Sequence, residues 1–525
     1  MYDIIIRNGL IIDGTNRRKF SGDVGVKRGK IAKVGELKSD RAGLIIDAKE
    51  KIVAPGFIDL LNHSDGYWTM FNFPHLESLT QQGITTMIGG GSGTSLAPLA
   101  SPETIQTIRR WTNVEEITLN WLTVSELLAE IERQKLAVNF GTLVGHITLK
   151  RGLIKDAVRD FTEPEFKIAE KMLDRALYEG AFGFSTGLTY SHGKFAKVAE
   201  IIRLVKIVSK YNGIYATALR DEGAGLVSAV DEAIAVGKAT AVPVEISQFK
   251  AKGKNNFPLF KEALSHIEQA ANQQVNINFD LYPYAITGTV LYTYLPDWVT
   301  QGGRHAMMEK LRSPQLRSKI LAEMIKSGHD FSGLTIAQSS NLAFVGKKIT
   351  ELGRESRVSP AEAVINTLLA SNGKAICFDP ALNENNVKTG LTNPLSIIAT
   401  DGSGYSPSYA ESKNLVHPRC FGTYPRFLGR YVREQKLLGW EEAIYKITGM
   451  PARKLGILDR GFIQENLQAD LVVFDPAQIR DDATFENPYH FPDGIVSVIV
   501  NGQEVVHQGQ NTGRRPGTVL RRGKN

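Results

Sequence analysis

Cysteine is the rarest residue type in this 525-residue sequence. The only two, Cys377 and Cys420, lie far apart and form no Cys-x-x-Cys pair. Two isolated cysteines exclude a disulfide framework and a thiolate zinc site. We therefore expect a protein of the reducing cytoplasm.

Long apolar runs are also missing. Nowhere do about 18 apolar residues follow one another, which is the length that a membrane-spanning helix requires. The first residues, MYDIIIRNGLIIDG, lack the basic stretch and long apolar stretch of a signal peptide. We expect a soluble cytoplasmic protein with no membrane partner.

No part of the sequence concentrates positive charge in a way that would suit a nucleic acid. The formal net charge is +7 and the pI is about 9.0, yet lysine and arginine are dispersed along the chain. Hydrophobic residues make up 42% and charged residues 22%, as in ordinary globular proteins. We predict no nucleic-acid partner, and a mildly cationic surface that favours acidic small molecules.

Both ends of the chain have the pattern of β-strands. Residues 3–13 and 22–34 are short β-branched runs with Asn-Gly and Arg-Gly turns, and residues 469–475 and 494–509 contain similar runs with another Asn-Gly turn. A chain of this length exceeds one small core. We predict a small β-sandwich domain made from residues 1–54 and 465–525, whose exposed edge could support a homo-oligomer.

Residues 55–464 alternate between short apolar runs and longer amphipathic stretches, such as the one that begins near Thr162. Repeated strand and helix units predict parallel crossovers and favour an α/β (β/α)₈ barrel of the TIM type over an open sheet. A helical segment around 290–345 interrupts this rhythm. It is interpreted as an insertion over the active face, either a lid or a rigid decoration.

Several motifs resemble those of one known family. They are ValAlaProGlyPheIleAsp at 53–59, GlyIleThrThr with SerLeuAlaProLeu within 83–99, AlaPheGlyPheSerThrGlyLeuThrTyr at 181–190, AspLeuTyrProTyr at 280–284 and HisProArg at 417–419. In order and position they resemble the D-aminoacylase branch of the amidohydrolase superfamily. The resemblance implies a (β/α)₈ barrel, a β-domain built from both termini, and hydrolysis of an N-acyl bond by zinc-bound water.

The metal ligands that the resemblance implies are mostly replaced. Where the family has histidine, cysteine, histidine and histidine, this chain has Leu61, Ser92, Ala218 and Gln248, and only His63 and Asp401 remain. A catalytic zinc needs about three protein ligands and an open position. We therefore predict no metal and no cofactor; the alternative is one zinc in a rebuilt site that also uses His146 or His192.

The predicted substrate-binding groups are better preserved. Lys250, Arg419 and Tyr282 match family residues that look suited to holding the amino acid's carboxylate. An arginine fork binds a carboxylate bidentately, a lysine adds a charge and a phenol donates a hydrogen bond. Tyr190 and Gln248 complete this set. Taken singly, each could instead be an ion-pair partner or a packing residue.

The predicted catalytic residues are Asp401, His63, Lys250 and Ser92. Asp401 follows a strand and is expected to move protons with His63, or else to anchor loop backbone. Ser92 could act as a nucleophile beside them, although no Gly-x-Ser-x-Gly elbow surrounds it. Arg220, Asp221 and Glu222 are expected to order a loop.

Three functions follow from these residues. The first is an amidohydrolase-type enzyme acting without zinc on an N-acyl amino acid or another carboxylate-bearing amide, by hydrolysis, transfer or condensation. The second is a zinc-dependent N-acyl-D-amino-acid deacylase with a rebuilt metal site. The third is a ligand-binding pseudoenzyme.

Overall fold

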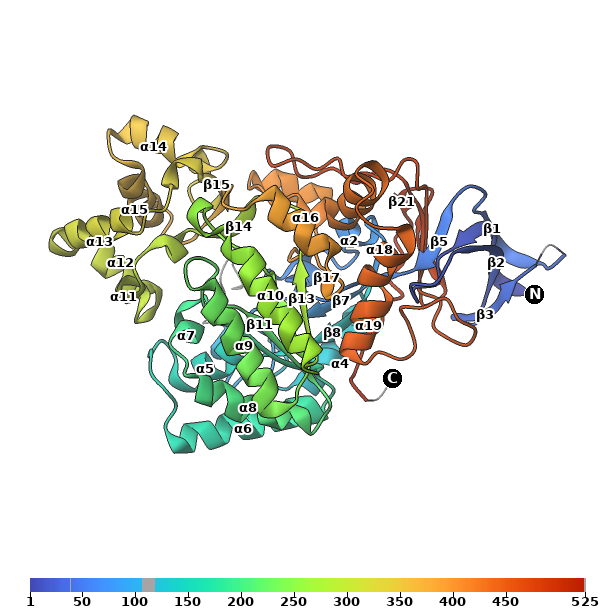
Figure 1. Ribbon diagram of the computed structural model, residues 1–525, viewed down its shortest axis with the longest axis horizontal. Coiled ribbons are helices and arrows are strands. Elements are labelled where there is room, and N and C mark those ends of the chain that lie inside the picture. Colours follow the sequence, from blue (N-terminus) through green and yellow to red (C-terminus); the bar gives the residue numbers. More distant parts are fainter. Residues whose placement is uncertain (38, 106–118, 524–525) are drawn as a thin grey trace.

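The computed structural model describes residues 1–37, 39–105 and 119–523. A barrel occupies the middle of the molecule, with a β-domain at one end and a helical insertion at the other (Figure 1). Within the described residues, no helix combines the length and the apolar character that crossing a membrane requires.

Eight barrel positions alternate with helices along the chain. The strands are β6 (Phe57–Asp59), β7 (Ile84–Gly89), β8 (Asn139–Thr142) with β9 (Val144–Gly145), β10 (Gly183–Gly187), β11 (Ile214–Ala218), β12 (Val244–Ser247), β13 (Ile277–Leu281) and β17 (Ser396–Ile398). Each overlaps one of the short apolar stretches that residues 55–464 contain.

All pairings between neighbouring barrel strands are parallel. The first and last strands meet just beyond their ends, where Asn62 pairs with Gly402 and the Asp401 N–H donates to the Leu61 carbonyl at 3.0 Å. The predicted (β/α)₈ barrel is confirmed.

Helices surround this barrel. They are α1 (Thr69–Asn72), α2 (Glu77–Thr80), α4 (Val124–Gln134), α5 (His146–Ile154), α6 (Glu163–Tyr178), α7 (Ser191–Lys194), α8 (Val198–Ser209), α9 (Leu226–Thr240), α10 (Leu259–Asn272), α16 (Glu384–Thr392), α17 (Arg419–Arg426), α18 (Trp440–Ile447) and α19 (Gly449–Leu455). A π-helical segment over Phe427–Glu434 follows α17. The helix expected near Thr162 is α6, and the Thr162 N–H donates to Glu165 at 2.8 Å.

The barrel is closed at the end where its strands begin. Inward residues such as Ile58, Phe182 and Ile214 form one apolar cluster with Leu455 of α19 and Leu520 near the C-terminus. A floor of this kind leaves the opposite end, where the strands finish, open to ligands, as in other barrels of this type.

One nine-stranded sheet forms the β-domain from both chain ends. Its strands are β1 (Tyr2–Ile11), β2 (Phe20–Lys27), β3 (Lys30–Gly35), β4 (Ala42–Asp47), β5 (Ile52–Pro55), β18 (Leu471–Phe474), β19 (Ile495–Val500), β20 (Gln503–His507) and β21 (Gln510–Asn511). The turns at Arg28-Gly29 and Asn501-Gly502 are confirmed. The turn expected at Asn8-Gly9 is wrong, because Asn8 adopts a φ of 60° inside β1 and forms a bulge.

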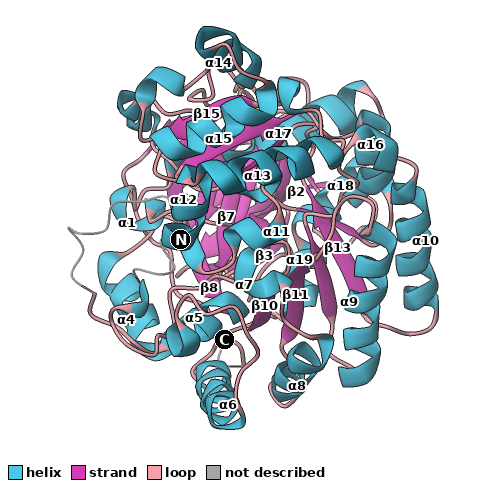
Figure 2. Cartoon of the chain, turned by 90° about the vertical axis from the view of Figure 1, so that its left-hand side faces the viewer, coloured by secondary structure: helices cyan, strands magenta, loops and turns pink. Residues whose placement is uncertain are grey.

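The insertion is longer than the sequence indicated. It contains β14 (Thr287–Val290), α11 (Asp297–Thr300), α12 (Gly303–Arg312), α13 (Pro314–Lys326), β15 (Thr335–Ser339), α14 (Ile349–Ser356), α15 (Pro360–Ala370) and β16 (Ala375–Asp379). Its own apolar core runs from Leu291 to Cys377, beyond the expected end near 345. It leaves the barrel directly after β13, at the open end, and faces the viewer in Figure 2.

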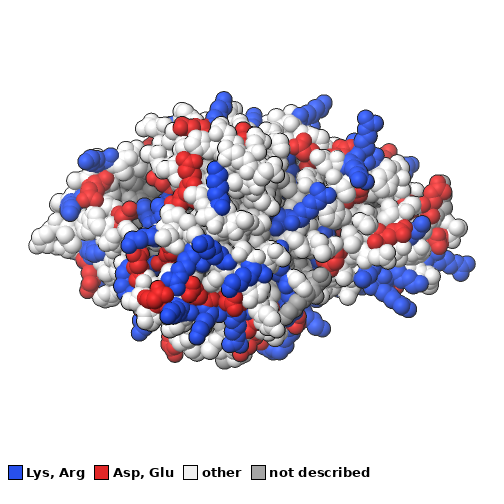
Figure 3. Space-filling model, turned by 60° about the horizontal axis from the view of Figure 1, so that its bottom comes forward, with Lys and Arg blue, Asp and Glu red and all other residues white. Residues whose placement is uncertain are grey.

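Acidic and basic side chains are mixed on the face shown in Figure 3, where no continuous field of one sign appears. Many are paired: Arg203, for example, bridges Glu163 and Glu170, both at 2.8 Å. The dispersed charge of the sequence is therefore also dispersed on this face.

Candidate active site

Four predicted residues follow barrel strands at the open end. His63 comes after β6, Ser92 after β7, Gln248 after β12 and Asp401 after β17. Ser92, Gln248 and Asp401 adopt φ values of 50°, 50° and 46°, in the left-handed region. Such a conformation costs a non-glycine residue about 1–3 kcal/mol and is typical of functional sites.

Asp401 is the centre of the site. Its Oδ1 lies 2.9 Å from His63 Nε2, and its Oδ2 lies 2.9 Å from an Nη atom of Arg419. Burial alone would raise the pKa of Asp401, but Arg419, His63 and the nearby Lys250 hold that pKa below its usual value. Asp401 is therefore an ionised carboxylate that faces the charged Arg419 and Lys250 and the imidazole of His63.

Arg419, the first residue of α17, is 9% exposed. Its Cζ lies 4.7 Å from the centre of the Tyr282 ring, and the Tyr282 hydroxyl donates to Thr287 at 2.9 Å. Burial works to lower the pKa of Arg419, but the nearby Asp401 carboxylate raises that pKa above its usual value. Its Nε and Nη1 atoms are buried and have no hydrogen-bond partner among the described residues. Part of a buried guanidinium fork is thus left available to an anion.

Lys250 is held in place by the loops after β11 and β12. Its Nζ donates to Glu222 at 2.5 Å and to the carbonyl and side-chain oxygens of Gln248 at 3.0 and 3.2 Å. Burial works to lower the pKa of Lys250, but Glu222, Tyr282 and Asp401 raise it above its usual value. Lys250 is therefore a permanent charge rather than a base.

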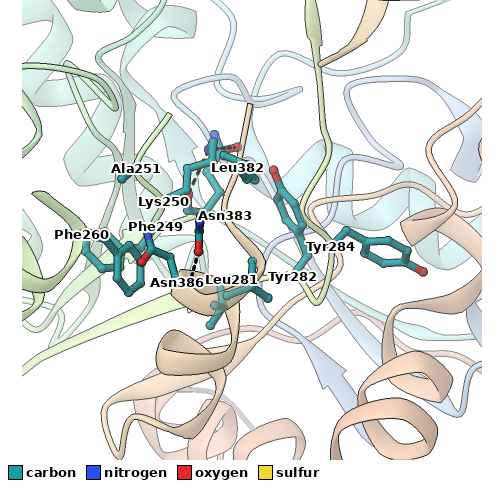
Figure 4. A pocket seen from close by; sticks show the side chains of 12 residues that line it. Phe249, Lys250, Ala251, Phe260, Leu281, Tyr282, Tyr284, Leu382, Asn383 and Asn386 are labelled. Carbon is teal, nitrogen blue, oxygen red and sulfur yellow. Dashed lines mark hydrogen bonds between the residues drawn. The ribbon is translucent and has the colours of Figure 1, made fainter. Parts of the chain in front are cut away.

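A small pocket of about 20 Å³ adjoins Lys250, with room for about one water molecule. Figure 4 shows Lys250 between Phe249 and Phe260 on one side and Tyr282 and Tyr284 on the other. Lys250 also lines a larger cavity of about 670 Å³ between the barrel loops and the insertion. The lysine thus connects the Asp401 centre to the large cavity.

Ser92 is 4% exposed, and its buried Oγ has no hydrogen-bond partner among the described residues. A Cβ added to the preceding Gly91 would lie 2.5 Å from Leu61 Cδ1 and 3.7 Å from His63 Cε1. The backbone before Ser92 therefore runs past His63 at contact distance, and a side chain at Gly91 would displace the end of Leu61.

Tyr190 lines the large cavity and packs against the insertion beside Val290 and Phe378. The structure therefore divides the predicted residues into two groups. Asp401, His63, Arg419 and Tyr282 form the inner group, while Tyr190 and Gln248 lie on the cavity wall.

Sequence reasoning missed the role of Glu222, which was expected only to order a loop. Its neighbours do so: Arg220 pairs with Glu232 at 2.5 Å, and Asp221 accepts the Gly223 N–H at 2.6 Å. Glu222 instead holds Lys250. The available signal was the position of Glu222. It is an acidic residue in the loop after β11, and the predicted Lys250 lies in the loop after the neighbouring strand β12.

The other candidate metal ligands do not join this site. His146 binds Glu200 at 2.8 Å, inside a buried group that includes Lys150, and His192 binds the Lys155 carbonyl at 3.0 Å. Among the described residues, no three His, Cys, Asp or Glu side chains are placed to hold a metal ion.

Comparison with known proteins identifies the family. The amidohydrolase family model matches residues 44–506. D-aminoacylase from Alcaligenes xylosoxydans xylosoxydans is 33% identical over 524 residues, covering 99% of this chain and 98% of that protein. The chain belongs to the amidohydrolase family.

Solved structures agree with this family. N-acyl-D-glutamate deacylase from Bordetella bronchiseptica, in complex with zinc and a phosphonate inhibitor, has a TM-score of 0.84 at 31% identity and covers 99% of both chains. A D-aminoacylase structure has a TM-score of 0.83 at 32% identity, covering 99% of this chain and all of the other. The family, the fold and the prediction of an enzyme of amidohydrolase descent are confirmed.

The same relatives contradict the prediction of no cofactor. The deacylase was solved with zinc, and the D-aminoacylase has a binuclear metal center. The residues described in this amidohydrolase do not fit such a site, because His63 and Asp401 bind each other and Leu61, Ser92 and Ala218 take the other implied positions. No step below is routed through a metal.

Proposed function

We propose that this amidohydrolase cleaves N-acyl-D-amino acids into a carboxylic acid and a free D-amino acid. Full-length relatives at 32–33% identity include a D-aminoacylase, an N-acyl-D-aspartate deacylase and an N-acyl-D-glutamate deacylase. The observation that carries the proposal is the buried guanidinium of Arg419, whose Nε and Nη1 lack partners among the described residues. A carboxylate-bearing substrate supplies what this guanidinium lacks.

The substrate carboxylate binds Arg419. Asp401 occupies one Nη of the fork and leaves the other N–H groups for a charge-assisted contact. Lys250 adds a second positive charge nearby, and its donors remain bound to Glu222 and Gln248. Of the two roles predicted for Lys250, we assign it substrate binding, since its raised pKa keeps it protonated.

His63 is the residue that transfers the proton. When its Nε2 donates to the ionised Asp401, its Nδ1 is left as an acceptor, the arrangement that suits a general base. The His63 side chain is 20% exposed, so water can reach it. Asp401 is the positioning group of this pair.

The bond changes balance with one water molecule. The water oxygen attacks the acyl carbon while His63 takes a proton, and the Ser92 hydroxyl is available to donate to the carbonyl oxygen. The C–N bond then breaks, and His63 returns the proton to the leaving nitrogen. The products are the carboxylic acid and the amino acid.

Arg419→Lys tests the proposal in assays of amine release from N-acetyl-D- and N-acetyl-L-amino acids, all with added zinc. Lysine keeps the charge beside Asp401 but loses the fork, and one charged hydrogen bond is worth about 1.5–3 kcal/mol, or about 10- to 150-fold. We expect KM to rise and kcat/KM to fall by that factor.

Arg453→Lys is the matched control, because this exposed arginine also lies over a tyrosine ring, in α19, whose Leu455 helps to close the opposite end of the barrel. A KM unchanged in Arg419→Lys would contradict carboxylate binding by Arg419. Substrate binding without turnover in the wild type would instead support the pseudoenzyme.

A further inference from the structure

The cavity beside the site is larger than an N-acetyl group requires. Its volume is about 670 Å³, within the range of about 300–1,000 Å³ that encloses drug-sized ligands. One wall comes from the barrel loops and includes Tyr190 and Lys250; the other comes from the insertion and includes Tyr294 and Trp298. The acyl half of the substrate has this space to fill.

An edge strand of the insertion borders this cavity. The strand order β14-β16-β15 leaves β14 paired on one side only. Thr287, Gly288 and Thr289 all line the cavity, and because side chains alternate along a strand, three consecutive residues present the edge rather than one face. An unpaired edge offers backbone N–H and C=O groups to another extended chain.

Gly288 marks the middle of this edge. It is half-buried. An added Cβ there would lie 3.4 Å from His417 Cδ2 and 4.0 Å from an Nη atom of Arg419, both ordinary contact distances. The edge of β14 therefore begins beside the proposed carboxylate site and leads away from it.

The cavity wall also carries carboxylates without an ion-pair partner among the described residues. Its cations are matched: Lys194 pairs with Asp297, Arg220 with Glu232, and Lys252 lies 3.4 Å from Asp379. Asp221 and Glu323 also line the cavity, and neither has an ion-pair partner among the described residues. Arg419 thus favours a carboxylate at one end, and the insertion wall that carries Glu323, called the outer wall below, favours an ammonium group.

We propose that the acyl half of the substrate is a short peptide with a free amino terminus, which pairs with the edge of β14. This inference rests on the proposed function and narrows its substrate class to peptides that end in a D-amino acid. Backbone hydrogen bonds to an exposed strand edge are an established mode of peptide recognition. The bond that breaks is then the last peptide bond, and the hydrolysis remains balanced by one water.

The test compares substrates that share one C-terminal D-amino acid, using the full chain with added zinc. They are the N-acetyl compound, the dialanyl peptide, the same peptide methylated on its second backbone nitrogen, and an alkanoyl compound of equal length. Two backbone hydrogen bonds at about 0.7 kcal/mol each predict a kcat/KM about tenfold higher for the peptide than for the alkanoyl compound. We expect methylation to lower the kcat/KM of the peptide about threefold, because one of the two backbone hydrogen bonds is lost.

Glu323→Gln tests the outer wall, with the exposed Glu309→Gln on α12 as the matched control. A half-exposed ion pair is worth up to about 1 kcal/mol, so the preference for the free-amino over the N-acetylated dialanyl peptide should fall about threefold in Glu323→Gln only. Equal kcat/KM for peptide and alkanoyl compounds would overturn the inference and leave the proposed function standing. Turnover of none of the four would overturn both.

Discussion

Asp401→Asn is the substitution that disturbs the site most directly. It keeps the size of the side chain and removes the negative charge that contacts Arg419 and His63 and lies near Lys250. The contacts to His63 and Arg419, both at 2.9 Å, lose their ionic character. The variant is therefore expected to affect both stability and activity.

Stability is expected to fall at neutral pH. Removing one partner of a buried ion pair costs about 3–5 kcal/mol, since the other charge is left without compensation. The pKa of Asp401 is lowered in the folded state, so its stabilisation is complete above its unfolded pKa of about 3.9 and is lost as pH falls through the folded pKa. The stability difference between wild type and variant should therefore shrink below about pH 4.

Activity is expected to fall further than stability explains. An asparagine can offer its NH₂ group to His63, which favours the wrong tautomer and takes the free acceptor from Nδ1. Loss of general acid–base catalysis costs about 10²- to 10⁴-fold in kcat. Because the proposed mechanism gives Asp401 the role of positioning His63 and not of binding the substrate, KM should change less than kcat.

The assay is amine release from the preferred N-acetyl-D-amino acid with added zinc, with thermal unfolding followed from pH 3.5 to 7.5. Asp47→Asn is the control, because Asp47 also has a lowered pKa but lies on the surface, where Asn8 is the main cause. Asp401→Asn with wild-type kcat and wild-type stability would refute the reasoning.

Other parts of the structure make three further predictions. Glu222→Gln removes a carboxylate that raises the pKa of Lys250, so the alkaline limb of the kcat/KM profile should move to lower pH. Thr123→Ala removes the N-cap of α4, whose hydroxyl accepts the Glu126 N–H at 3.2 Å, and should cost about 1 kcal/mol in the free energy of unfolding by denaturant. Lys150→Met leaves the buried carboxylate of Glu200 with one partner fewer, and the apparent Tm should fall more than in Thr123→Ala.

The barrel was predictable because its signal is local and repeated. Short apolar runs such as residues 243–249 and 275–284 each contain one buried parallel strand, and strands buried on both faces have continuous apolar sequences. The capping residue at Thr162 likewise marked a helix start from four adjacent residues. Such features require no knowledge of distant contacts.

The insertion was less predictable because its sheet is long-range. β14 and β16 pair across almost 90 residues, and their sequences are too short to distinguish from loop. The Asn8-Gly9 pair has the composition of a turn, yet tertiary pairing with β2 continues the strand through it. Long-range pairing overrode the local signal in both places.

The inner site was predictable by resemblance, but its electrostatics were not. The sequence pointed to Asp401, His63, Arg419 and Tyr282, which the structure brings together. It could not show that the three N–H groups of Lys250 are already used, because that depends on side-chain packing between two loops. The catalytic and binding roles of these residues stay predictions until they are measured.

The most direct test of the central claim is the release of free amino acids from a panel of matched N-acetyl-D- and N-acetyl-L-amino acids by the wild-type chain. The panel is run with and without added zinc, so that the supply of metal does not decide the result. We expect turnover of D-substrates, little or none of L-substrates, and loss of that turnover in Arg419→Lys. No turnover of any N-acyl amino acid under either condition, from folded protein, would contradict the account.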